Sequence, residues 1–308
     1  MGIIDTLSAG FNTVLRNLWL MTVPVLLDVA LWLAPKLTVA PVVEELVASM
    51  RAAVTTFGAS VGSDASLQQM VDAMDAMLQQ SVGRANLMTA LSWGRLGVPG
   101  IAGLHQIEPG VDRVIELSSY GQWLGTEVAL LLVGLLIACV YLGMLGQQVR
   151  GEGLRLDKLV KRVLTYWAYL LIFLVPLGAL LFGVVGSSLV MGALSFLFWA
   201  LMLWVLIYVA FVPAAITMAE ARPLQALAAS LTIVRTAFWP SLGLLILVNV
   251  IALGLGWVWM QLAGGTVGTL AAILLNAFVG TSLTAAQFIF FRDRMAALRA
   301  ASQQLRSA

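Results

Sequence analysis

One acidic side chain of this 308-residue chain, that of Asp28, lies inside a long apolar segment. Asp28 is near the middle of an apolar run from Asn17 to Pro35, and Pro24 precedes it by one helical turn. Ionisable groups inside a bilayer are expensive to bury, so they mark candidate functional sites. Asp28 could serve transport or ligand binding, or it could bond to a neighbouring helix and fix packing alone.

Two amide side chains, Asn249 and Asn276, lie in the last two long apolar segments, which a glycine-rich turn joins. Helical geometry puts each roughly 12–13 Å from one end of its segment, so the two could meet across the hairpin. Such bonds contribute about 0.6 kcal/mol inside membranes, which favours a packing role. The alternative is a polar pathway that they form with Thr284, Gln287 and Asp28.

The sequence offers no catalytic or metal-binding set. Nucleophilic catalysis needs a nucleophile, a base and an orienting group, and the single histidine, His105, has no Ser or Cys partner at a recognisable spacing. A metal site needs several ligands, and no phosphate-binding glycine loop occurs. The single cysteine, Cys139, excludes an intrachain disulfide. We predict a protein that is not an enzyme and has no cofactor or metal, with unfamiliar lipid chemistry as the alternative.

The elements that must position these residues are membrane-spanning helices. Hydrophobic residues make up 61% of the chain and charged residues 10%, against about 25% charged in soluble domains. A crossing needs roughly 20 apolar residues, so the uncharged runs predict an all-α integral membrane protein with six transmembrane helices. The predicted spans are residues 17–36, 125–147, 165–186, 189–212, 241–262 and 267–291. The net charge of +2 gives no reason to expect nucleic-acid binding.

The positions of the basic residues predict the orientation. Lys and Arg are retained on the cytoplasmic side during insertion, and placing both termini in the cytoplasm puts most of the 17 basic residues there. The inverted orientation reverses this bias. We therefore predict a multi-pass protein of the plasma membrane, in contact with the lipid bilayer, with cytoplasmic N- and C-termini and a first helix that is retained as an anchor.

Three stretches share one layout, in which a short amphipathic helix ends near an Arg, a Trp follows, and a span begins. They are residues 5–16 with Trp19, residues 154–162 with Trp167, and residues 224–235 with Trp239. This layout predicts three helical hairpins of one plan, with an insertion in the first. The alternative is that any hairpin entering from the cytoplasm shows Arg and then Trp, because Trp favours the headgroup level.

Residues 41–122 are predicted to form a helical extracytoplasmic insertion between the first and second spans. Apolar residues with helical spacing predict one helix after Pro41 and a second around residues 66–78, and no strand pattern is present. Met side chains suit adaptable binding faces, so this outer loop could bind a protein partner. The alternative is that they form the underside of helices lying on lipid or on the bundle. The Met residues are Met50, Met70, Met74 and Met77.

The stretch from Phe211 to Leu242 carries a recognisable motif. Its key residues are Pro213, Glu220, Pro223, Ser230 and Trp239. It resembles a signature of bacterial six-helix membrane proteins of unknown function, to which the membrane domain of some glycerophosphodiester phosphodiesterases is similar. The resemblance implies six spans and a role for Glu220 and Ser230 at the cytoplasmic face, but no shared activity. We expect Ser230 to bond a carbonyl of its own helix and Glu220 to cap that helix.

Two functional hypotheses follow. The first is a non-enzymatic membrane protein of binding or assembly type, which acts as an accessory subunit or scaffold through its outer loop. The second is a small transporter or lipid-handling protein that uses Asp28 and the intramembrane Asn residues.

Overall fold

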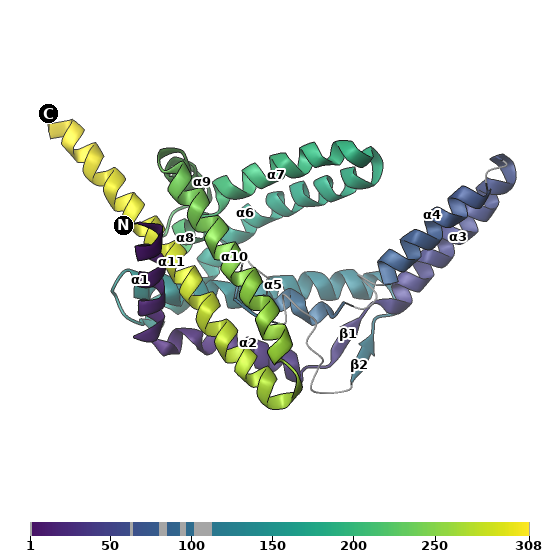
Figure 1. Ribbon diagram of the computed structural model, residues 1–308, viewed down its shortest axis with the longest axis horizontal. Coiled ribbons are helices and arrows are strands. Elements are labelled where there is room, and N and C mark those ends of the chain that lie inside the picture. The colour runs from purple at the N-terminus through teal and green to yellow at the C-terminus, as the bar shows by residue number, and fades with distance from the viewer. Residues whose placement is uncertain (1, 62–63, 80–84, 93–96, 102–112, 308) are drawn as a thin grey trace.

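The computed structural model describes residues 2–61, 64–79, 85–92, 97–101 and 113–307, and it is almost entirely helical (Figure 1). Within these described residues, five helical segments are long and apolar enough to cross a membrane, and a bent helix pair raises the number to six if it counts as one span. These are the features of an all-α membrane protein. Four of these segments lie in α5 (Tyr120–Val149), α6 (Leu156–Met191), α10 (Phe238–Leu262) and α11 (Gly265–Ser307). The fifth, Ser195–Thr217, combines α7 (Ser195–Val209) with the short α8 (Val212–Thr217).

The predicted first span, residues 17–36, is not one straight helix. Helix α1 (Ile3–Leu15) leads through the 3-10 turn Leu18–Met21 into α2 (Thr22–Leu33), with a bend of 92° between them. The 12 residues of α2 rise about 18 Å, which is short of the roughly 30 Å hydrocarbon core. The amphipathic helix predicted at residues 5–16 forms, but it packs against α11 inside the bundle (Figure 1).

The other two predicted amphipathic stretches differ from each other in how their helices continue. Residues 224–235 lie in a separate helix, α9 (Pro223–Thr236), which follows the short α8 (Val212–Thr217). Residues 154–162 instead run without a break into α6, because nothing between Leu156 and Trp167 interrupts the helix. The three entry segments therefore do not share one local structure, although α6–α7 and α10–α11 are both helical hairpins.

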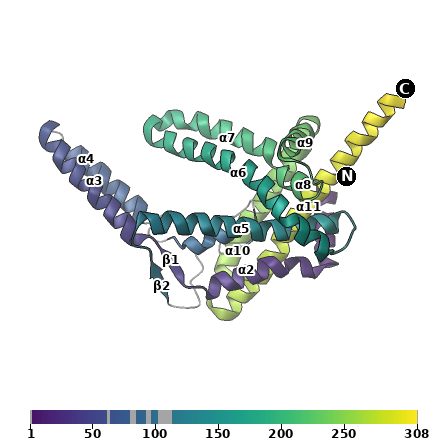
Figure 2. The ribbon, with the colours of Figure 1, turned by 180° about the vertical axis from the view of Figure 1, so that it is seen from behind.

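The segment predicted as an insertion, residues 41–122, contains helices, as predicted, and its ends are joined by two short strands, which were not predicted. Helices α3 (Ala40–Val61) and α4 (Asp64–Leu78) lie side by side and project from the body (Figures 1 and 2). Strand β1 (Lys36–Thr38) pairs in parallel with β2 (Val114–Glu116). These strands are three residues long, so they carry no detectable period-2 pattern. The ladder joins the two ends of the insertion.

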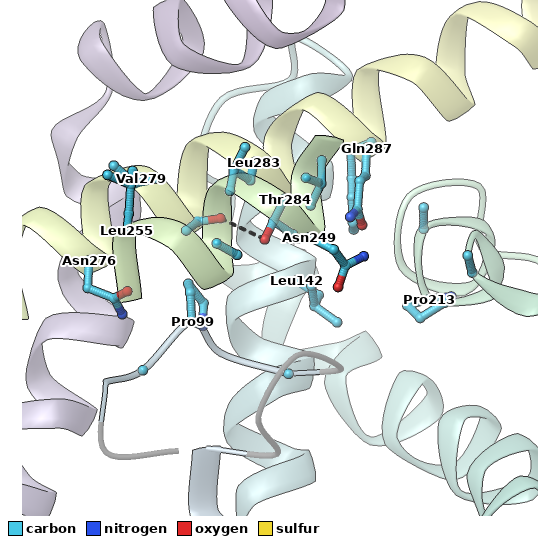
Figure 3. A pocket seen from close by; sticks show the side chains of 18 of the residues that line it. Pro99, Leu142, Pro213, Asn249, Leu255, Asn276, Val279, Leu283, Thr284 and Gln287 are labelled. Atoms are coloured by element: carbon cyan, nitrogen blue, oxygen red, sulfur yellow. Dashed lines mark hydrogen bonds between the residues drawn. The ribbon is translucent and has the colours of Figure 1, made fainter. Parts of the chain in front are cut away.

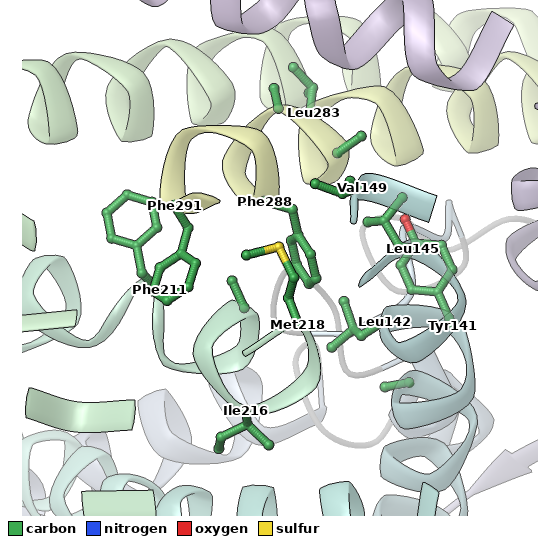
Figure 4. Packing of buried hydrophobic residues seen from close by; sticks show 14 of the residues in the cluster. Tyr141, Leu142, Leu145, Val149, Phe211, Ile216, Met218, Leu283, Phe288 and Phe291 are labelled. Atoms are coloured by element: carbon green, nitrogen blue, oxygen red, sulfur yellow. The ribbon is translucent and has the colours of Figure 1, made fainter. Parts of the chain in front are cut away.

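A hydrophobic core forms where α5, α8 and α11 meet (Figure 4). Leu142 and Leu145 of α5 are buried there with Ile216 of α8 and Phe288 of α11. The ring of Phe211, at the start of α8, stacks on Phe290 with centroids 5.5 Å apart. This core fixes the relative positions of the helices that form the candidate site.

The start of α6 packs against α5 in this core, and the rest of the α6–α7 hairpin extends away from it (Figure 2). Leu177, Val184 and Met202 form a small internal cluster between the two helices. Large apolar side chains such as Phe182 and Phe196 stay exposed on the outside. Exposed apolar surface of this extent is typical of helices that face lipid.

Candidate functional site

A cavity of about 160 Å³ lies between α5, α8, α10 and α11 (Figure 3). Part of its wall is the loop segment 97–100, which reaches into the bundle. Four neutral polar side chains line the cavity, and the remaining wall is mostly apolar. The polar residues are Asn249, Asn276, Thr284 and Gln287. The two amides singled out by the sequence therefore share one cavity with two further members of the predicted polar pathway.

Asn276 is the most deeply buried of these groups. Its exposed fraction is 7%, and its Nδ2 atom has no hydrogen-bond partner in the described part of the chain. An unsatisfied buried polar group costs about 1–3 kcal/mol, so such groups call for a specific explanation. A side chain that lines a cavity and keeps an unused donor is suited to bind a ligand acceptor.

The other polar side chains already use part of their hydrogen-bonding capacity. Asn249 donates from Nδ2 to the Leu245 carbonyl at 2.8 Å. Thr284 donates from Oγ1 to the Gly280 carbonyl at 2.9 Å (Figure 3). Because a hydroxyl has one donor and two acceptor lone pairs, the Thr284 oxygen still has acceptor capacity. The cavity wall thus includes Asn276, whose buried donor is unpartnered in the described structure, and Thr284, which has acceptor capacity.

Asp28 lies behind the cavity wall, where it holds the loop in place. Its Oδ2 accepts a hydrogen bond from the backbone N–H of Ile101 at 3.0 Å, and the carboxyl group is buried, with 2% of the residue exposed. A Cβ atom on Gly100 would lie 2.7 Å from Asp28 Oδ1, so only glycine lets the backbone approach this closely. Asp28 therefore positions the segment that contributes Pro99 to the cavity.

Pro99 itself packs directly on α11. A Cβ atom on Gly280 would lie 2.3 Å from Pro99 Cβ, so the missing side chain of Gly280 makes room for the proline ring. Val98 and Ile101, on either side, are almost completely buried. The sequence identified this stretch only as irregular, because Gly and Pro mark turns without indicating burial.

Two of the motif residues of the suggested resemblance act differently from the expectation. Ser230 of α9 donates to the Tyr208 carbonyl at 2.7 Å and accepts from the Phe211 N–H at 3.2 Å. It therefore satisfies the backbone at the break between α7 and α8, and not a carbonyl of its own helix. Glu220 has a positive φ of 54° and pairs with Arg162 of α6, without capping α9.

The remaining motif residues mark helix starts. Pro213 is the second residue of α8 and lines the cavity, and Pro223 is the first residue of α9. Proline is favoured at these positions because the first turn of a helix does not use its N–H groups. Trp239, at the start of α10, is 78% exposed; its predicted position at the headgroup level stays a prediction.

The predicted partner face is only partly described. Met50 of α3 and Met74 of α4 are partly exposed. The side chains of Met70 and Met77 lie outside the described part of the structure, as does His105. Arg51 of α3 pairs with Asp72 at 3.1 Å and with Asp75 at 2.9 Å, which ties α3 to α4.

Comparison of the chain with protein families, with curated proteins and with solved structures finds no match. The suggested resemblance therefore stays a prediction. The geometry of the cavity is the basis for a functional assignment.

Proposed function

We propose that this chain is a non-catalytic, multi-pass membrane protein that binds a small uncharged molecule in the cavity between α5, α8, α10 and α11. It would act as a small transporter or lipid-handling protein, in a plasma membrane with both termini in the cytoplasm. The observation that carries the proposal is the convergence of four neutral polar side chains in an otherwise apolar cavity. Ligand sites commonly combine apolar walls with a few placed polar groups.

The size of the cavity limits what it can hold. About 150 Å³ is enough for one benzene molecule in an engineered protein cavity, and the volume here is about 160 Å³. The occupant would thus be a small molecule or one section of a larger lipid. The polar lining is uncharged in the described residues, which favours a neutral group, because a buried charge needs a paired charge or a metal.

The test is to identify which small molecule stays bound to the purified protein and whether that molecule is bound in the cavity. The protein would be extracted in mild detergent, and bound small molecules would be measured by native mass spectrometry. Ala252→Phe, on α10, fills the cavity, and Val250→Phe is the matched control on the exposed side of the same helix. We expect Val250→Phe to retain the bound molecule and Ala252→Phe to lose it. Equal occupancy in both variants would contradict the proposal.

A second candidate function is assembly through the outer hairpin of α3 and α4. It is favoured by one observation, the projection of this braced hairpin from the body (Figure 2). A protein subunit that binds it should be extracted with the chain in a fixed ratio. Shortening the hairpin should abolish that association, whereas Ala252→Phe should leave it intact. Purification of the chain without another subunit would exclude this function.

A further inference from the structure

The polar atoms of the cavity indicate the chemical class of its occupant. Building on the proposed function, we infer that the ligand is an uncharged carbonyl compound, such as an ester, whose carbonyl oxygen accepts a hydrogen bond from Asn276 Nδ2.

The donor is the first step of this inference. An amide nitrogen can only donate, and Asn276 Nδ2 is buried and unpartnered in the described structure. A ligand that satisfies it must bring an acceptor to the end of the cavity nearest the α10–α11 turn, where Leu255 and Trp259 also line the wall. A carbonyl oxygen fits best among neutral acceptors, because its partial negative charge is larger than that of an ether or hydroxyl oxygen and it therefore accepts a stronger hydrogen bond.

The second step is the charge of the ligand. The other polar side chains of the cavity belong to Asn249, Thr284 and Gln287, which are all neutral. A carboxylate or phosphate buried beside them would lack a paired cation among the described lining residues, and burying such a charge is strongly unfavourable. An ester, amide or ketone supplies the same acceptor without the charge.

The third step is the shape of the site. Asn276 and Thr284 are both on α11, and eight residues of helical rise separate them by about 12 Å. Between them the wall is formed by Val279, Gly280 and Leu283. Figure 3 shows Asn276 and Gln287 toward opposite ends of the view. A linear molecule with its carbonyl at Asn276 and an alkyl portion along this wall fits the arrangement, and a hydroxyl at its far end could donate to Thr284 Oγ1.

The test compares two probes that differ only in the carbonyl. One is a monoacylglycerol ester with a photoreactive diazirine in its chain, and the other is its ether analogue. The wild-type protein would be placed in nanodiscs of ether-linked phospholipid, which contain no competing ester. We expect the ester to bind about five- to tenfold more tightly than the ether, as the loss of one neutral hydrogen bond implies, with labelling of the α10 and α11 wall.

Asn276→Leu removes the donor with little change of volume, and Asn12→Leu is the matched control at an exposed position of α1. The ester preference should fall to about onefold in Asn276→Leu and persist in Asn12→Leu. Equal binding of the two probes by the wild type would overturn the inference while leaving the proposed function intact. Binding of neither probe, together with no molecule retained on purification, would overturn both.

A last experiment distinguishes a membrane lipid from a free small ester as the ligand, because both contain a carbonyl group. The labelling would be repeated in nanodiscs of ester-linked phospholipid. Reduced labelling means that the bilayer's own lipids occupy the site, and unchanged labelling means that a free ester is the ligand. Both results support recognition of a carbonyl, whereas labelling that is unaffected by Asn276→Leu in either bilayer contradicts it.

Discussion

Replacing Gly10 by alanine should separate α1 from α11. A Cβ atom at this position would lie 2.5 Å from the Ser282 carbonyl oxygen and 2.8 Å from the Ala286 backbone nitrogen. Neither backbone atom can move alone, so the helices must shift apart. Overpacking of this kind costs about 1–3 kcal/mol, while alanine gains about 0.5–1 kcal/mol over glycine in a helix.

The matched control is Gly178→Ala on α6, where an added Cβ would meet nothing within 4 Å. The helix-forming gain is common to both variants, so their free energies of unfolding should differ by about 1–3 kcal/mol, with Gly10→Ala the less stable. The measurement is equilibrium unfolding in mixed micelles with increasing denaturing detergent. Equal unfolding midpoints for the two variants would refute the close contact of α1 with α11.

Three further predictions concern polar contacts. Ser230→Ala leaves the buried N–H of Phe211 without its acceptor and should lower the free energy of unfolding by about 1–3 kcal/mol in the same assay; an unchanged midpoint would contradict the bridging role. Asp28→Leu removes the acceptor of the Ile101 N–H, so this variant should lose the ligand that native mass spectrometry detects. Asp28→Asn keeps an acceptor oxygen and should retain the ligand. Equal loss of the ligand in both variants would mean that the charge of Asp28 is needed. A double-mutant cycle on Arg162 and Glu220, whose side chains are 44% and 37% exposed, should give a coupling energy below about 1 kcal/mol, and a larger value would show that this pair holds α6 in place.

The long helices could be predicted from the sequence because an uncharged apolar run is a local property. Residues 125–147 lie within α5, and residues 241–262 lie within α10. The bend between α1 and α2 and the pairing of β1 with β2 depend on contacts between distant parts of the chain. No local pattern encodes such contacts, so these features were missed.

The candidate site was predictable in its residue types but not in its geometry. Asn249 and Asn276 stand out as amides in apolar helices, and the helical rise gives the distance of each residue from the end of its helix. Asn249 alone marked the face of α10 that lines the cavity, because the rest of that helix shows no amphipathic stripe. The role of Asp28 in fixing Ile101 depends on a loop whose burial its Gly and Pro residues do not indicate.

The contact of α1 with α11 has a consequence for biosynthesis. Every other described helix of the chain is made between these two, so α1 cannot pack against its partner until α11 has been synthesised. Contacts between such distant segments form more slowly than the hairpins α6–α7 and α10–α11, whose partners are adjacent in sequence. A ribosome that stalls before α11 would therefore leave α1 undocked, and that unpaired helix is a feature by which membrane quality-control proteases could recognise the unfinished chain.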